Sequence, residues 1–181
     1  NEALKILKNK KNLRIIDSGY LNKIDLNQIS SNINSYLLQT SDNFPFLKSN
    51  FKVVSKIKPS PKTLKSLLFA FNICRFVKSN AIVLANKDTT IGIGSGQSSR
   101  LDSCEIAIRK MKKFYKEKEG DEIIAASDAF FPFVDGIEKL VQSGVSAIIQ
   151  PSGSIRDKEI IKFANRTNTV LVFSKTRHFK H

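Results

Sequence analysis

Short apolar runs alternate with amphipathic stretches over the second half of the chain. Five runs have the length and the residue types of buried strands: Ala81–Ala85, Thr89–Ile93, Ile123–Ala126, Ala147–Gln150 and Thr169–Phe173. Between most of these runs, apolar residues recur every three or four positions, which predicts amphipathic helices. This order is typical of an α/β fold in which helices cover a parallel or mixed sheet.

Residues typical of helix ends locate two of the helices. Ser60 is a suitable N-cap, Pro61 stands at the first helical position, and an apolar stripe continues to Cys74. A shorter helix is expected over Ile137–Gln142, with Gly144 as its C-terminal cap.

Two more helices are expected after a Ser that is followed three residues later by an Asp. This is the spacing of a capping box, and it predicts one helix from Ser99 to about Lys116 and another from Ser154 to about Asn165.

The first half of the chain has weaker patterns. Residues 1–10 have helical spacing, and Leu13–Ile16 is predicted to be a short strand. Residues 17–50 are polar, with a single strand predicted at Ser35–Gln39, and Phe51–Ile57 alternates as a strand does.

The charge is strongly positive. Lys and Arg number 30 against 16 Asp and Glu, which gives +14, but 23 of the cations are Lys and only 7 are Arg. Arg is the side chain that reads phosphates and base edges best, and the excess is spread along the first half of the chain. A nucleic-acid-binding role therefore stays open without being favoured, and the apolar runs are too short to span a membrane.

The metal-ligating and thiol residues are few. Cys74, Cys104, His178 and His181 are the only cysteines and histidines. Their spacing supplies neither the four ligands of a structural zinc site nor a disulfide framework. We expect no metal and a reduced, cytoplasmic protein.

Three polar segments follow predicted strands and are expected to converge, because ligands bind at the carboxyl ends of strands in such sheets. They are Gly94–Arg100, Ser127–Asp135 and Gln150–Arg156. The first belongs to a Gly-rich turn before a helix, which is either an anion site or a tight turn. The third ends a strand and begins a helix.

The segment Ser127–Asp135 carries three Phe in four residues around a Pro. In one interpretation the phenylalanines form the wall of a pocket for a flat ring, whose polar edge Asp128 and Asp135 would bind. In the other, the phenylalanines belong to the core and the two aspartates are caps. Core packing is favoured for Phe131 and Phe133.

Two further positions have alternative interpretations. Asn80 is either an αL cap of the preceding helix or an amide that faces a reacting carbonyl. The tail at Arg177 is either frayed or closes over a phosphate.

In order and spacing, these segments resemble the bifunctional purine-biosynthesis family in which AICAR transformylase is joined to IMP cyclohydrolase. The resemblance rests on Lys78–Ile82, Gly92–Arg100, Ser127–Phe133, Gln150–Asp157 and Arg177–His181. It implies that residues 1–181 are the C-terminal portion of the transformylase domain, with a cytidine-deaminase-like fold. It also implies formyl transfer from 10-formyltetrahydrofolate to the 5-amino group of AICAR, which gives FAICAR.

The resemblance also implies ligand residues. Those that would contact AICAR are Asn80, Arg100, Phe130 and Arg177, with Arg177 on the phosphate. Those that would contact the folate are Leu101, Asp135, Ser154 and Ile155. Asn80 would orient the amine or stabilise the oxyanion of the tetrahedral intermediate.

The chain departs from the family pattern in one respect. The family's general base lies in a Lys-His-x-Asn-Pro-Cys motif, which this sequence lacks, and the cyclohydrolase domain is absent as well. The resemblance implies a homodimer whose active site lies at the subunit interface, so we expect this piece to be inactive alone. A nucleic-acid-binding module and a nucleotide-binding regulatory domain are the alternatives.

Overall fold

The computed structural model describes residues 2–16, 19, 27–43, 48–116 and 118–180. The chain divides into two units, Asn1–Asn43 and Phe44–His181, and each is described by itself. His181, part of the predicted tail motif, lies outside the described residues.

The smaller unit contains one short helix and one hairpin. Helix α1 spans Glu2–Leu7, and strands β1 (Gln28–Asn32) and β2 (Ser35–Gln39) pair antiparallel. The predicted helix and the strand at Ser35–Gln39 are confirmed, although the helix is shorter than expected. The strand predicted at Leu13–Ile16 is wrong, because these residues have no regular structure.

The larger unit contains a six-stranded mixed sheet, which confirms the predicted α/β architecture. Its strand order is β3-β8-β7-β6-β4-β5. Strands β6, β7 and β8 are parallel, whereas β4 runs antiparallel to both of its neighbours and β3 runs antiparallel to β8. The strands span Phe51–Val53 (β3), Ile82–Asn86 (β4), Thr89–Gly94 (β5), Ile123–Ser127 (β6), Val145–Pro151 (β7) and Val170–Ser174 (β8).

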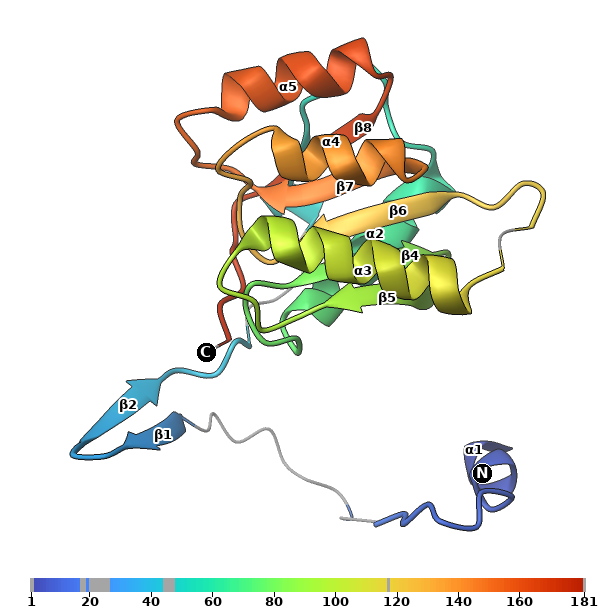
Figure 1. Ribbon diagram of the computed structural model, residues 1–181, viewed down its shortest axis with the longest axis vertical. Helices are drawn as coiled ribbons and strands as arrows, with labels where there is room; N and C mark the ends of the chain where they lie inside the picture. The colour runs from blue at the N-terminus through green and yellow to red at the C-terminus, as the bar shows by residue number, and fades with distance from the viewer. Residues whose placement is uncertain (1, 17–18, 20–26, 44–47, 117, 181) are drawn as a thin grey trace. The chain divides into compact units, whose positions relative to one another are not determined.

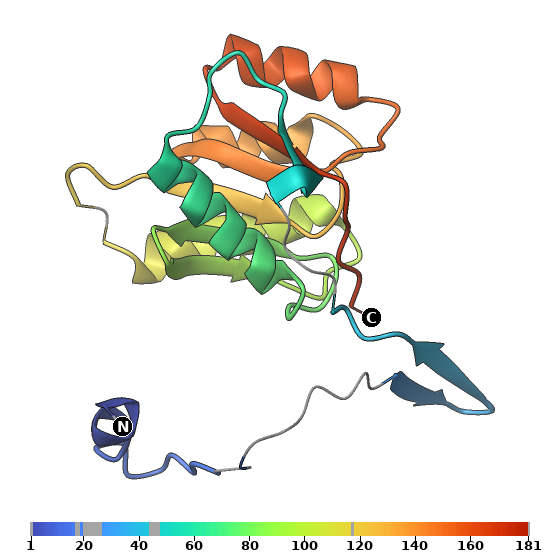
Figure 2. The same cartoon turned by 180° about the vertical axis from the view of Figure 1, so that it is seen from behind.

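Helices cover both faces of this sheet (Figure 1). Helix α2 (Pro61–Cys74) lies on one face, which Figure 2 shows from the front, and packs against β4, β6 and β7. The opposite face carries α3 (Arg100–Phe114), α4 (Asp135–Gln142) and α5 (Asp157–Arg166). Each face buries its own apolar cluster, so the sheet is the middle of three layers.

Local signals fix where α2 and α3 begin. The hydroxyl of Ser60 accepts a hydrogen bond from Thr63 N, and the hydroxyl of Ser99 accepts one from Asp102 N. These bonds satisfy N–H groups that the first turn of a helix leaves without partners. Both predicted N-caps are therefore confirmed.

The contacts of the capping box predicted at Ser154 are present, although regular helix begins later than expected. The Ser154 hydroxyl accepts a hydrogen bond from the Arg156 N–H, and the Asp157 carboxylate accepts hydrogen bonds from the N–H groups of Gly153 and Ser154. Helix α5 begins at Asp157, with Arg156 at the N-cap position and no side-chain hydrogen bond from that residue's cap. The aspartate thus folds the loop that precedes the helix.

Several other boundaries differ from expectation, most of them by one or two residues. Strand β3 ends at Val53 rather than at residue 57, α4 begins two residues earlier than predicted, and α3 ends at Phe114. Among the described residues, no helix is both long enough and apolar enough to cross a bilayer.

Candidate ligand site at the carboxyl edge of the sheet

A cavity of about 530 Å³ lies at the edge of the sheet where β6 ends and α3 and α4 begin. Four separate segments line it: residue 80, residues 98–101, residues 129–136 except Val134, and the tail residues 177 and 179. Six of the eight predicted ligand residues are among them: Asn80, Arg100, Leu101, Phe130, Asp135 and Arg177. The predicted convergence of strand-end segments thus holds for two of the three segments.

Arg100 is the buried cation of this cavity. It is 9% exposed, and its Nη1 donates to the Asp128 carboxylate at 2.5 Å and to the Ser127 hydroxyl at 2.9 Å. Its Nη2 donates to Asn80 Oδ1 at 2.8 Å. A guanidinium has five N–H donors, so among the described residues these bonds leave Nε and one Nη2 proton for a ligand.

Asp128 is fully buried beside Arg100 and does not line the cavity. Its second carboxylate oxygen accepts a hydrogen bond from the Ser79 hydroxyl at 2.6 Å. The structure therefore does not support the alternative in which Asp128 binds the polar edge of a ligand ring. Its carboxylate neutralises the buried Arg100, which a low-dielectric site requires.

Asn80 sits between the tight turn and Arg100. Its Nδ2 donates to the carbonyl oxygens of Gln97 and Ser98, at 2.9 and 3.2 Å, and its Oδ1 accepts from Arg100. Its φ is not positive, so it is not the αL cap that the sequence allowed. Both amide protons are used by the turn, and Oδ1 keeps one lone pair for a further donor.

The glycines of the turn serve close packing. A Cβ on Gly94 would lie 1.8 Å from the carbonyl oxygen of Ser103, and one on Gly92 would lie 2.3 Å from that of Ala107. Helix α3 therefore lies directly on β5 only because both residues lack side chains. Gly96 has φ +69 and forms the turn itself. These contacts favour the tight-turn interpretation for the glycines.

The three phenylalanines have three different surroundings. Phe130 is half-buried and lines the cavity, whereas Phe131 is 1% exposed and packs under Gly136. Core packing is thus confirmed for Phe131 and wrong for Phe133, which is 52% exposed at the rim. Gln150 Oε1 accepts a hydrogen bond from the N–H of Phe131 and holds this loop against β7.

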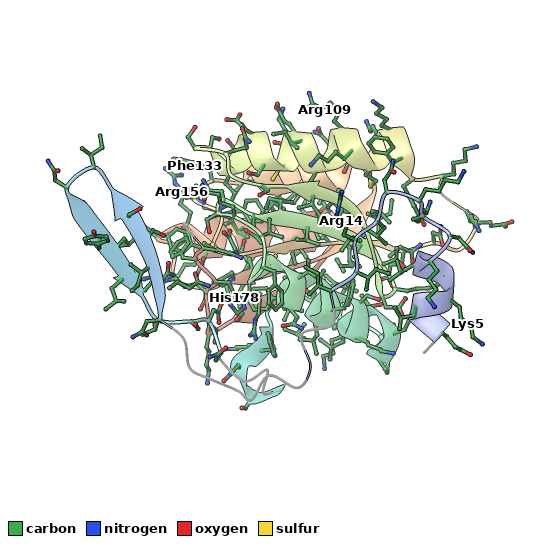
Figure 3. The ribbon with its side chains drawn as sticks, turned by 90° about the horizontal axis from the view of Figure 1, so that it is seen from below. Lys5, Arg14, Arg109, Phe133, Arg156 and His178 are labelled. Carbon is green, nitrogen blue, oxygen red and sulfur yellow. The ribbon has the colours of Figure 1, made fainter. Side chains whose placement is uncertain are left out.

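The third predicted loop reaches the rim through Arg156. Its guanidinium lies 4.9 Å from the centre of the Phe133 ring, and Figure 3 shows the two side chains next to each other. Ser154 and Ile155 do not line the cavity, and Ile155 is fully exposed. The structure therefore does not bring these two predicted folate residues together with the other six.

The C-terminal tail is anchored rather than frayed. His178 N donates to the Asp128 carbonyl at 2.9 Å, and the His178 ring is 1% exposed against Phe71. The backbone N–H of Ser79 donates to the carbonyl of Lys180. The tail thereby carries Arg177 to the cavity, where its guanidinium lies 5.1 Å from the Phe179 ring centre.

Neither cysteine is suited to nucleophilic or metal chemistry. Burial raises the pKa of the Cys104 thiol to about 12, and burial together with the nearby Asp128 carboxylate raises the pKa of Cys74 well above its ordinary value. Among the described residues, no group of three or more His, Cys, Asp or Glu could hold a metal ion.

A sequence model of the family described as AICARFT/IMPCHase bienzyme matches residues 1–110, more than half of the chain. The chain belongs to the AICARFT/IMPCHase bienzyme family.

Curated relatives in this bienzyme family agree with the match. The bifunctional purine biosynthesis protein PurH of Buchnera aphidicola subsp. Schizaphis graminum is 45% identical over 184 residues, 99% of this chain and 34% of that protein. The proteins of the same name from Aquifex aeolicus and Leptospira biflexa are both 42% identical, over 99% and 100% of this chain. The chain spans about a third of the length of these relatives.

The sequence did not identify the residues that bond Arg100 and the C-terminal tail without lining the cavity. Ser79, Asp128 and His178 connect Arg100 to the tail, yet the sequence offered only Asp128 as a ligand contact and His178 only as a metal ligand. A buried aspartate directly after an apolar strand was the one available signal, because it requires a cationic partner.

Proposed function

We propose that the chain is part of a purine-biosynthesis enzyme and that its cavity binds AICAR for formyl transfer. The formyl group moves from 10-formyltetrahydrofolate to the 5-amino group of AICAR, and FAICAR and tetrahydrofolate are formed. The name of the relatives supports the pathway, and the description of the family supports the reaction. The observation that carries the proposal is that six predicted ligand residues, drawn from four segments, line one cavity.

AICAR has a charged end and a flat end, and the cavity has a group suited to each. Arg177 and Phe130 are on its wall, so the phosphate pairs with the guanidinium and the imidazole ring lies against the phenyl ring. Arg100 offers AICAR the N–H donors that are not bonded to Asp128, Ser127 or Asn80. Because both ends of the nucleotide are held, its amine is aligned with the formyl donor. The entropic cost of bringing the two together is then met on binding and does not add to the barrier of the reaction.

Formyl transfer needs a group that positions the amine. The amine nitrogen attacks the formyl carbon and a base takes the amine proton. The bond between the formyl carbon and N10 of the folate then breaks, and N10 takes up a proton to give tetrahydrofolate. The Asn80 amide protons are bonded to Gln97 and Ser98, whereas Oδ1 keeps acceptor capacity. These contacts favour amine orientation by Asn80 over stabilisation of the oxyanion.

Only two of the four residues predicted to contact the folate lie at the cavity. Leu101 and Asp135 line the cavity, whereas Ser154 and Ile155 lie beyond it, on the loop that Arg156 brings to the rim. We place the folate across this rim, with a second subunit of a homodimer completing its site. The fully exposed Ile155 side chain supports a surface that another element covers.

We further propose that the chain is the C-terminal portion of a transformylase domain and that the larger unit is a cytidine-deaminase-like lobe. The whole protein would be a cytoplasmic enzyme that also cyclises FAICAR to IMP. The general base would come from the Lys-His-x-Asn-Pro-Cys motif of the part that this sequence does not contain. The isolated chain is therefore inactive, and no step is assigned to a metal.

A chimera tests the function. The segment of Buchnera aphidicola PurH that this chain matches is replaced by the chain itself, since the two are 45% identical. We expect the chimera to convert AICAR and 10-formyltetrahydrofolate to FAICAR, and the isolated chain to show no turnover. A folded chimera without turnover would contradict formyl transfer, and turnover by the isolated chain would contradict the assignment of the base.

A nucleotide-binding regulatory domain is the second candidate. It is favoured by the position of Ser154 and Ile155, because a site that binds only AICAR does not need them. Separate titrations with AICAR and with 10-formyltetrahydrofolate distinguish the two functions in the chimera. Binding of AICAR alone would favour the regulatory domain, and binding of both favours the transformylase.

A further inference from the structure

Building on the proposed function, we infer that Ser79 and Asp128 are positioning residues that set the two arginines of the cavity from behind. Neither residue lines the cavity. Asp128 holds Arg100 directly, and Ser79 holds the tail that carries Arg177. The nucleotide site then depends on a hydrogen-bonded connection that no ligand touches.

Asp128 is the centre of this connection. Its side chain is fully buried, with one carboxylate oxygen on Arg100 Nη1 and the other on the Ser79 hydroxyl. Its backbone carbonyl accepts the N–H of His178, the residue directly after Arg177. One residue at the end of β6 therefore contacts the guanidinium of one arginine and the backbone beside the other.

Ser79 fastens the tail on the far side of Arg177. Its N–H donates to the Lys180 carbonyl at 2.9 Å, and its hydroxyl oxygen accepts the Lys180 N–H at 3.1 Å while donating to Asp128 at 2.6 Å. On the near side, the Ser174 hydroxyl bonds both the N–H and the carbonyl of Thr176. Arg177 is thus held between fixed backbone positions, although its own side chain is exposed.

The two connections differ in what their loss would do. Removing the Asp128 carboxylate leaves Arg100 as a buried charge without its counterion, which threatens the fold. Removing the Ser79 hydroxyl keeps that ion pair. It removes one of the two bonds between Ser79 and Lys180, together with the hydrogen bond to the second carboxylate oxygen of Asp128. Ser79→Ala is therefore the variant that separates positioning from general stability.

The connection predicts selectivity for the phosphate. If Ser79 acts through Arg177, its loss weakens ligands that carry a phosphate and spares those that lack it, because Arg100 and Phe130 keep their places. The nucleotide AICAR and the corresponding riboside differ only in this phosphate. The ratio of the affinities for AICAR and for the riboside therefore reports on the position of the tail. If Ser79 had only a structural role, its loss would not change this ratio.

Calorimetric titration of the 181-residue chain with AICAR and with the riboside tests the inference. We expect Ser79→Ala to weaken AICAR by about tenfold, the scale of one charge-assisted hydrogen bond, and to leave the riboside within about twofold. Ser143→Ala is the matched control, because Ser143 is also half-buried and, among the residues that the structure describes, its hydroxyl bonds only the Leu140 carbonyl, outside the cavity. It should change neither affinity.

A double-mutant cycle completes the test. Ser79→Ala on top of Arg177→Ala should cost little further AICAR affinity, since both changes remove the same contact. Additive losses, or an equal loss for the riboside, would overturn the inference. Failure of the wild-type chain to bind AICAR would instead reject the proposed function.

Hydrogen exchange gives a reading that needs no ligand. The backbone N–H groups of His178 and Lys180 should exchange faster in Ser79→Ala than in the wild-type chain and in Ser143→Ala. Unchanged protection of the tail in Ser79→Ala would show that the hydroxyl does not anchor it, whatever the fate of nucleotide binding.

Discussion

Arg100 and Asp128 form an ion pair beneath the cavity, with 2.5 Å between Nη1 and Oδ1 and side chains that are 8% and 0% exposed. They come from the start of α3 and the end of β6, 28 residues apart in the chain. Two charges are taken out of water here, so each requires the other. The pair joins the two elements whose ends form most of the cavity.

Loss of the Asp128 carboxylate should therefore destabilise the fold strongly. We expect Asp128→Ala to lower the free energy of unfolding by about 3–5 kcal/mol, because Arg100 remains buried without its counterion. Urea denaturation with the slope held common to both proteins measures the change.

The exposed pair between Arg156 and Glu159 is the matched control for that experiment. Its side chains are 46% and 55% exposed, so Glu159→Ala should cost less than about 1 kcal/mol. Equal effects of the two substitutions would contradict a special cost of burial at Asp128.

The close contact of α3 with β5 gives a second prediction. A Cβ at residue 94 would lie 1.8 Å from the Ser103 carbonyl oxygen, so Gly94→Ala must push the helix off the strand. We expect a loss of about 3 kcal/mol in unfolding free energy, measured by chemical denaturation.

Gly120→Ala serves as the comparison for Gly94→Ala. Residue 120 has open space around it and a φ of +77, so its replacement costs only the backbone strain of about 1 kcal/mol. If Gly94→Ala is no worse than Gly120→Ala, the close packing of α3 is not what requires glycine.

The regular elements of the larger unit were predictable because their signals are local. Runs such as Ile123–Ala126 are continuous apolar segments that are buried on both faces of the sheet. The start of α2 is fixed by two adjacent residues, the Ser60 cap and Pro61 at the first helical position. Strand β1 was not predicted, because Gln28–Asn32 contains a single apolar residue and has no alternating pattern. It is defined by its antiparallel pairing with β2, which the sequence of the segment does not indicate.

The candidate site shows the same division. The cavity residues lie at strand ends, so topology alone brings Asn80, Arg100 and Phe130 together. The position of Asp128 directly after an apolar strand indicates that it needs a cationic partner, but nothing near it in the sequence identifies Arg100, 28 residues away, as that partner. For the same reason the sequence left open whether the tail is frayed, because one of its anchors, Ser79, lies about a hundred residues away.

The edge of the sheet opposite the cavity contains a pH-dependent contact. Hydrogen bonds from the Tyr115 hydroxyl, the Lys118 N–H and the Asn86 amide lower the pKa of Asp121 to about 2. A carboxyl whose pKa falls on folding stabilises the native state above its unfolded pKa and loses this contribution as the pH drops. Asp121→Asn should therefore be less stable than wild type at neutral pH, and the difference should shrink as pH falls from about 4 toward 2.

Thermal unfolding of Asp121→Asn across this pH range measures the effect. Asp88→Asn, in the exposed turn between β4 and β5, is the control and should match wild type at every pH. A stability difference for Asp121→Asn that does not vary with pH would argue against its ionised carboxylate as the cause.

The two thiols should be unreactive in the folded chain. Cys74 and Cys104 are both 0% exposed, and burial raises the pKa of each, so little thiolate is present at pH 8. We expect no modification by a small disulfide reagent under native conditions and two modified thiols in guanidinium. Rapid reaction of either thiol in the native protein would contradict the packing of α2 or α3.

Calorimetric titration of AICAR against wild type and Arg177→Ala tests the assignment of the cavity most directly. We predict one site per wild-type chain and an affinity at least about tenfold weaker in Arg177→Ala, because a phosphate contact is lost. Arg109→Ala removes an arginine from the exposed face of α3, outside the cavity, and should bind as wild type does (Figure 3). No binding by wild type, or equal binding by all three proteins, would contradict the cavity as the nucleotide site.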